Sequence, residues 1–197
     1  AVFLERCLTP LVRRYPELRV VLEHVTTADG VAFVQSQGTN VAATITPHHL
    51  LLNRNAMFKG GIRPHNYCLP IVKREQHRKA LVDAATSGNP KFFLGTDSAP
   101  HLDSAKETAC GCAGIYNAPT AMACYAEVFD EADSLDKLAS FAAHFGADFY
   151  RLPRNTGALI LRRKESPSAP LPLTLGAEHI QVFTPEDGLK WTVEVID

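Results

Sequence analysis

Three short apolar segments rich in β-branched residues, separated by stretches with helical spacing, constrain the fold of this chain more than any other feature. They cover residues 19–25, 40–46 and 91–97. Apolar runs of this length are typical of strands that are covered on both faces, as in parallel sheets. The order of helix, strand, helix, strand, loop, helix and strand predicts a parallel α/β architecture, which is either a barrel or a doubly wound sheet.

The segments between and after these strands carry apolar residues at helical spacing. Residues 48–70 are the exception, because they are polar and rich in glycine and proline, which predicts a long loop at the carboxyl end of a strand. With 197 residues, the chain is expected to form one domain. The other expected elements are helices at residues 2–15, 28–38, 73–86, 118–129 and 135–145, a proline-rich surface stretch at 166–172 and a short strand at 192–195.

Charge and hydropathy exclude two classes of partner. Lysine and arginine total 20 against 21 acidic residues, and the sequence pI is about 6.8, so no basic field is available to attract nucleic acid. The apolar runs fall far short of the roughly 20 residues that a membrane span needs, and the first residues do not have the pattern of a signal peptide. Five cysteines, an odd number in a chain of this size, favour a reducing, cytoplasmic setting.

Polar side chains stand where each of the three expected strands ends. His24 lies at the carboxyl end of the first strand, Thr46 and Pro47 close the second, and Asp97 closes the third. In parallel barrels and open α/β sheets, catalytic groups collect at the carboxyl ends of the strands. Imidazole and carboxylate groups both suit zinc, so His24 and Asp97 are candidate ligands of a divalent metal.

Simpler interpretations of these residues stay open at this point. His24 could be a hydrogen-bonded core residue, and Asp97 could serve the turn that Ser98 continues. The Cys110 and Cys112 pair does not predict a structural zinc site, because such a site takes four ligands, commonly from two spaced pairs. The other histidines of the predicted loops are expected to be exposed and to have no function. They are His48, His49, His65 and His101.

Five contiguous strings carry a resemblance to a known family. In chain order they are LEHVTT at residues 22–27, AATITPHH at 42–49, RPHNYCLP at 63–70, GTDSAPH at 95–101 and CGCAG at 110–114. Together and in this order, the strings resemble dihydroorotases of the shorter, bacterial type, which belong to the amidohydrolase superfamily. The resemblance extends from the first helix past Pro119 and continues more weakly to the end.

The resemblance implies a fold. Its members form a distorted (β/α) barrel of the TIM type with eight strands, and residues 1–197 correspond to the C-terminal part of that single barrel domain. Strands six, seven and eight would end at His24, at Thr46 and Pro47, and at Asp97. The two-histidine motif of the first strand, the carboxylated lysine of the fourth and the histidine of the fifth belong to an N-terminal half that has no counterpart in these residues.

The resemblance also implies the roles of individual residues. His24 would bind one zinc ion of a pair, and Asp97 would bind the other and carry the proton during catalysis. His101 would contact the substrate carboxylate, and backbone groups of Leu69 and Ala113 would hydrogen-bond the pyrimidine ring. The resemblance further implies that three cysteines line the pocket without binding metal; they are Cys68, Cys110 and Cys112.

The implied reaction is the reversible, zinc-dependent cyclisation of N-carbamoyl-L-aspartate to L-dihydroorotate in de novo pyrimidine (UMP) synthesis. The isolated chain is expected to be inactive, to require the missing N-terminal segment, and to belong to a homodimer when complete. One alternative is a sister cyclic amidohydrolase such as a hydantoinase or allantoinase. Another alternative is a half barrel that serves assembly without catalysis.

Overall fold

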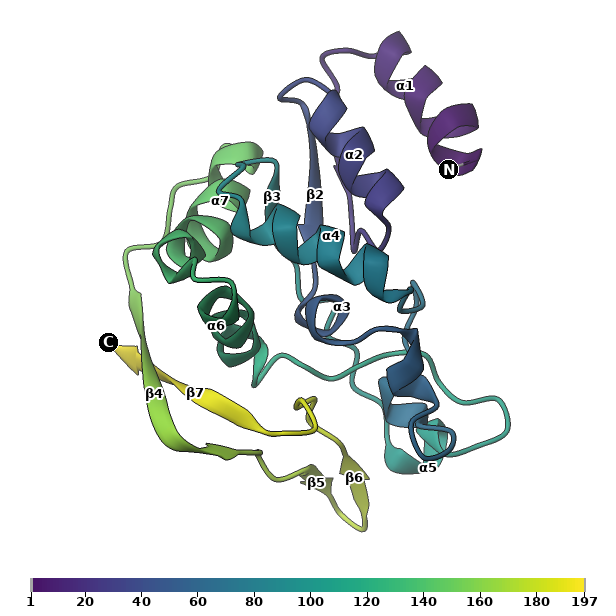
Figure 1. Ribbon diagram of the computed structural model, residues 1–197, viewed down its shortest axis with the longest axis vertical. Coiled ribbons are helices and arrows are strands. Elements are labelled where there is room, and N and C mark those ends of the chain that lie inside the picture. Colours follow the sequence, from purple (N-terminus) through teal and green to yellow (C-terminus); the bar gives the residue numbers. More distant parts are fainter. Residues whose placement is uncertain (1, 197) are drawn as a thin grey trace.

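The chain forms a three-stranded parallel sheet flanked by helices, followed by two antiparallel strand pairs (Figure 1). The computed structural model describes residues 2–196. The parallel strands are β1 (Val20–Leu22), β2 (Val41–Ile45) and β3 (Phe92–Leu94), which neighbour one another in chain order. Val20 lies opposite Val41, and Ala43 lies opposite Phe92. The parallel α/β architecture predicted from the sequence is therefore confirmed.

Helices connect and cover the parallel strands. Helix α2 (Ala28–Ser36) joins β1 to β2, and helix α4 (Glu75–Thr86) leads to β3; these two helices lie side by side in Figure 1 and contact each other. The remaining helices are α1 (Thr9–Arg14), α3 (Pro47–Leu51), α5 (Asp103–Lys106), α6 (Ala121–Glu131) and α7 (Phe145–Tyr150). The π-helical segments are η1 (Leu4–Leu8) and η5 (Ser140–His144), and the 3₁₀ segments are η2 (Arg54–Met57), η3 (Pro64–Asn66) and η4 (Leu135–Lys137).

The main core lies between one face of the sheet and helices α2, α4 and α6. Val41, Ala43 and Ile45 of β2 are almost completely buried there, together with Phe92 of β3. Burying one such large apolar side chain stabilises the fold by roughly 1.5–3 kcal/mol. The Tyr125 hydroxyl of α6 donates a hydrogen bond of 2.7 Å to the Ile45 carbonyl, so the aromatic ring is buried without an unsatisfied polar group.

The C-terminal part forms two antiparallel strand pairs that are separate from the parallel sheet. Strand β4 (Ala158–Ser168) pairs with β7 (Leu189–Ile196), and β5 (Leu173–Leu175) pairs with β6 (Glu178–Ile180). Strand β7 packs against α6, where the buried Glu127 carboxylate accepts a hydrogen bond from the Lys190 backbone N–H. The predicted strand at 192–195 lies within β7, and the predicted surface stretch at 166–172 is exposed throughout, although its first three residues belong to β4.

The structure also corrects the bounds of four predicted elements. Strands β1 and β3 are shorter than predicted, since the polar residues at their ends lie outside the hydrogen-bonded ladder. The predicted loop at 48–70 starts as helix α3, because Thr46 caps it through the His49 N–H at 3.2 Å and Pro47 occupies its first turn. The predicted helix at 135–145 is divided into η4, η5 and the start of α7.

None of the helices within residues 2–196 combines the length and the apolar character needed to cross a bilayer.

Candidate active site at the carboxyl ends of the parallel strands

His24 and Asp97 occupy equivalent places after β1 and β3, and each has an unusual backbone conformation. The φ angle is 51° at His24 and 44° at Asp97, in the left-handed region that non-glycine residues seldom adopt. Such conformations persist where surrounding contacts hold them, and they occur preferentially at functional sites. Both residues therefore occupy positions that the surrounding structure must hold in place.

Thr44 of β2 holds the backbone after β1. Its hydroxyl accepts a hydrogen bond of 2.9 Å from the His24 N–H, and its carbonyl accepts one of 3.0 Å from the Val25 N–H. On the other side, Gly95 approaches so closely that a Cβ atom there would lie 2.5 Å from the Thr44 Cβ. The central strand thus positions His24 directly and brings the segment that leads to Asp97 close beside it.

The two predicted metal ligands meet at this edge of the sheet. The His24 Nδ1 lies 3.5 Å from the Asp97 Oδ2, and both side chains are half-buried, with relative exposures of 27% and 29%. The Glu23 carboxylate lies 3.9 Å from the His24 Nε2 on the solvent side. The structure brings together the pair that the sequence singled out, and their roles in metal binding stay predictions.

His48 and His49 differ from the sequence expectation, because they are buried rather than exposed. Their exposed fractions are 0% and 2%. Burial, reinforced by the neighbouring His49, lowers the pKa of His48 to about 2. Burial also lowers the pKa of His49 to about 4, although a hydrogen bond to the Pro70 carbonyl opposes this shift. Both imidazoles are therefore neutral at pH 7. They are buried because they belong to helix α3, which begins directly after β2.

The buried histidines belong to a hydrogen-bonded layer at the carboxyl end of β2. The His49 Nε2 donates to the Pro70 carbonyl at 2.7 Å, and its Nδ1 lies 2.6 Å from the Thr46 hydroxyl. The Asn117 amide donates hydrogen bonds of 2.9 Å to the His48 Nδ1 and 2.8 Å to the Thr96 carbonyl, next to Asp97. Asn117 has no exposed surface. Nothing in its sequence position signalled this bridging role.

The same layer contains a second group of potential metal ligands. One donor atom each from His48, His49 and the Cys68 thiol lie within 4.8 Å of one another. However, both ring nitrogens of His49 already serve hydrogen bonds, and burial raises the pKa of the Cys68 thiol to about 11. Metal ligation would require a thiolate and free imidazole lone pairs, so this arrangement fits a structural layer better than a metal centre.

The predicted substrate-binding residues lie on two neighbouring loops. The His101 Nε2 lies 3.1 Å from the Ala113 carbonyl, so two of the three residues contact each other. Leu69 is 61% exposed on the other loop, which is joined to the first by a hydrogen bond of 3.0 Å from the Gly114 N–H to the Tyr67 carbonyl. The structure places the two loops together, and contact of these residues with a substrate remains a prediction.

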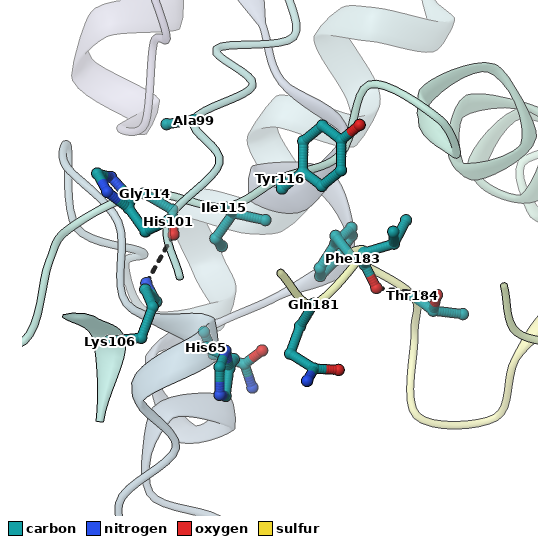
Figure 2. A pocket seen from close by; sticks show the side chains of 12 residues that line it. His65, Ala99, His101, Lys106, Gly114, Ile115, Tyr116, Gln181, Phe183 and Thr184 are labelled. Atoms are coloured by element: carbon teal, nitrogen blue, oxygen red, sulfur yellow. Dashed lines mark hydrogen bonds between the residues drawn. The ribbon is translucent and has the colours of Figure 1, made fainter. Parts of the chain in front are cut away.

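A cavity of about 100 Å³ opens beside these loops (Figure 2). His101, Gly114 and the buried Lys106 line one side, and the segment 181–184 after β6 lines the other. Neither His24 nor Asp97 lines this cavity. Of the predicted pocket-lining cysteines, Cys68 is buried, Cys112 is half-buried and Cys110 is exposed, and none of them lines the cavity either.

Comparisons with known proteins add independent evidence. No family model matches the chain. A dihydroorotase of Chelativorans sp. is 58% identical over 195 residues, which cover 98% of this chain and 56% of that protein. A dihydroorotase of Photobacterium profundum is 57% identical over 192 residues, with the same two shares. The chain thus spans about half the length of the curated relatives that it matches, and the match lies in their C-terminal half.

Solved structures give the same result. A dihydroorotase of Saccharomyces cerevisiae in complex with 5-fluoroorotic acid superimposes with a TM-score of 0.86 at 34% identity, over 95% of this chain and 54% of that one. A dihydroorotase of Campylobacter jejuni gives a TM-score of 0.83 at 30% identity, with the same coverage. An L-hydantoinase of Arthrobacter aurescens shares the fold with a TM-score of 0.67 at 19% identity over 95% of this chain and 46% of that one. The sheet and its helices are therefore the C-terminal half of an amidohydrolase barrel.

Proposed function

Because the chain belongs to the dihydroorotase family and matches its C-terminal half, we propose that the complete protein is a zinc-dependent dihydroorotase. It would interconvert N-carbamoyl-L-aspartate and L-dihydroorotate in de novo pyrimidine (UMP) synthesis. The observation that carries the proposal is the meeting of His24 and Asp97, 3.5 Å apart, at the carboxyl ends of β1 and β3, the parallel strands on either side of β2.

The two side chains suit zinc as a donor set. Zinc in catalytic sites is bound by imidazole nitrogen and carboxylate oxygen, and the position for substrate stays open. Within residues 2–196, the side chains of His24 and Asp97 form no hydrogen bond with other side chains, and both remain partly exposed at the rim. Their donor atoms are thus available, and the other ligands of a two-zinc site, including a carboxylated lysine, would come from the missing half.

Asp97 would carry the proton in the reaction. Bound zinc would lower the pKa of a water molecule and polarise the ring carbonyl. In the hydrolytic direction, the Asp97 carboxylate accepts a proton from the attacking water as the new C–O bond forms. It then delivers this proton to the ring nitrogen as the C–N bond breaks, which yields the open carbamoyl amino acid. Cyclisation follows the same steps in reverse.

The substrate would be held by the loops beside this pair. His101 would donate to a substrate carboxylate, and backbone groups of Leu69 and Ala113 would bind the ring amides. The arrangement supports this because the His101 ring contacts the Ala113 carbonyl, so the side chain and the backbone group share one small region.

The missing N-terminal half is the first proposed partner of this chain. Strand β1 has a strand neighbour on only one side within the described residues, and Val2 and Phe3 are each 61% exposed. Open parallel edges and exposed apolar helix residues favour association with further barrel strands and helices. The family resemblance also supports a homodimer, and the five free cysteines support a reducing, cytoplasmic setting.

Substitution of Asp97 tests the proposed function. In the complete protein, we expect Asp97→Ala to lower kcat for both directions by several orders of magnitude, because proton transfer and one metal ligand are lost together. Asp97→Asn keeps the size of the side chain and should lose kcat similarly. Activity is followed by the ultraviolet absorbance of L-dihydroorotate, and zinc content by elemental analysis. Asp29→Ala in helix α2 is the matched control and should behave as wild type. Wild-type turnover in Asp97→Ala would contradict the proposal.

A further inference from the structure

Lys106 is a buried cation whose role the catalytic proposal does not include. It ends helix α5, and only 3% of its surface is exposed. Within the part of the chain that the structure describes, the ammonium group forms no ion pair with a carboxylate; it donates to three backbone carbonyls instead. These belong to Tyr67 at 2.9 Å, Cys112 at 2.9 Å and Gly114 at 2.6 Å. An ammonium group has three N–H donors, so every donor is used.

The three carbonyls lie on the two loops that carry the predicted ring contacts. Cys112 and Gly114 are the residues on either side of Ala113, and Tyr67 precedes Leu69 by two positions. The carbonyl between them, that of Ala113, faces the His101 ring at 3.1 Å. Lys106 and His101 together therefore hold three consecutive carbonyls of this loop. Figure 2 shows the Lys106 side chain reaching the Gly114 carbonyl beside His101.

Neighbouring contacts leave the loop little freedom to adjust. Gly114 has a φ of 155°, and a Cβ atom there would lie 2.7 Å from both the Ala99 Cβ and the His101 ring. The next residue, Ile115, forms a bridge with Ser98 and accepts a hydrogen bond of 3.0 Å from the Ala99 N–H. The segment after Asp97 thus holds the loop at Gly114 and Ile115. The Lys106 ammonium group holds the same loop through the Cys112 and Gly114 carbonyls.

We propose that Lys106 is a positioning residue for the substrate ring, because its ammonium group sets the backbone of Ala113 relative to the Leu69 loop. This inference rests on the proposed function. The three hydrogen bonds to one cation fix the separation of the two loops, and a ring held between them needs that separation to bond with both. Lys106 itself does not contact the substrate; it acts through the backbone groups that it orders.

The test compares Lys106→Met and Lys106→Gln with the control Lys79→Met in the complete, zinc-loaded protein. Lys79 is exposed on helix α4, so the control removes a lysine without disturbing either loop. For the two Lys106 variants, we expect KM for L-dihydroorotate to rise about tenfold, the equivalent of roughly one hydrogen bond to the ring. The dissociation constant of orotate, a non-reacting ring acid, should rise by a similar factor, whereas kcat should change much less.

A purely structural role predicts a different pattern. In that case the variants lose thermal stability and active enzyme, while KM and orotate affinity of the folded fraction stay at wild-type values; this result would overturn the inference. Failure of both variants to fold would overturn it as well, because Lys106 would then serve the whole domain. A wild-type protein that neither binds orotate nor interconverts the two substrates would refute the proposed function itself, and the inference with it.

Discussion

Replacing Gly95 by alanine tests the idea that the contact between β2 and the segment after β3 sets the geometry of the candidate site. A Cβ atom at position 95 would lie 2.5 Å from the Thr44 Cβ and 2.9 Å from the Thr44 hydroxyl oxygen. An ordinary van der Waals contact begins near 3.4 Å, so the two backbones must separate by about 0.9 Å. Thr44 belongs to the central strand and is buried, so no flexible side chain can absorb this shift.

The magnitude follows from this displacement. Overpacking of a rigid core typically costs about 1–3 kcal/mol of stability. Because the Thr44 hydroxyl binds the His24 N–H and Gly95 leads to Asp97, the same displacement separates the two candidate ligands. A misplacement of about 1 Å at a catalytic group reduces turnover by roughly a hundredfold. We therefore expect Gly95→Ala to lower both the melting temperature and kcat/KM of the complete protein.

Gly38→Ala is the matched control for this substitution. It makes the same chemical change at an exposed position, where an added Cβ meets no atom within 4 Å. Both substitutions reduce the entropy of the unfolded chain in the same way, so the difference between them isolates the contact with Thr44. The assays are thermal unfolding by circular dichroism and steady-state kinetics with L-dihydroorotate. Equal stability and equal kcat/KM in the two variants would refute the reasoning.

Two further predictions concern protons and metal. Stability should fall as the pH drops below about 6.5, because unfolded His48 takes up a proton that the buried imidazole, with its pKa lowered to about 2, does not. His48→Gln should therefore weaken the pH dependence of the melting temperature between about pH 6.5 and 4.5, and an unchanged dependence would show that His48 is not responsible. The isolated chain should hold fewer than two zinc ions, since His24 and Asp97 are only part of a ligand set. Two tightly bound zinc ions per chain in elemental analysis would contradict the proposed half site.

The sequence predicted the central sheet and the candidate pair because both follow from local patterns. A buried parallel strand has a continuous apolar run, and its first polar residue marks the carboxyl end of the strand. His24 and Asp97 stand at such ends, so parallel order alone was enough to place them at one edge. Their left-handed backbone conformations and the close approach of Gly95 to Thr44 could not be predicted, since they depend on neighbouring strands.

Other features left no local pattern. Lys106 binds backbone carbonyls, which every residue carries, so its partners cannot be identified from residue types. His48 and His49 follow a strand in a polar region, and their burial depends on helix α3 packing against α4 and α6. Strand β4 includes a charged run at Arg162, Arg163 and Lys164 and is mostly exposed, so it lacks the alternation that indicates a strand.

The parallel order of β1, β2 and β3 has a consequence for how this region folds. Parallel neighbours must be joined by crossovers, so each pairing brings together residues that are distant in sequence, and such contacts form slowly during folding. The encounter of His24 with Asp97 requires that β1 and β3 have both docked on β2. The candidate ligand pair therefore forms only once the tertiary structure is complete, and in a partly folded chain the two side chains remain apart.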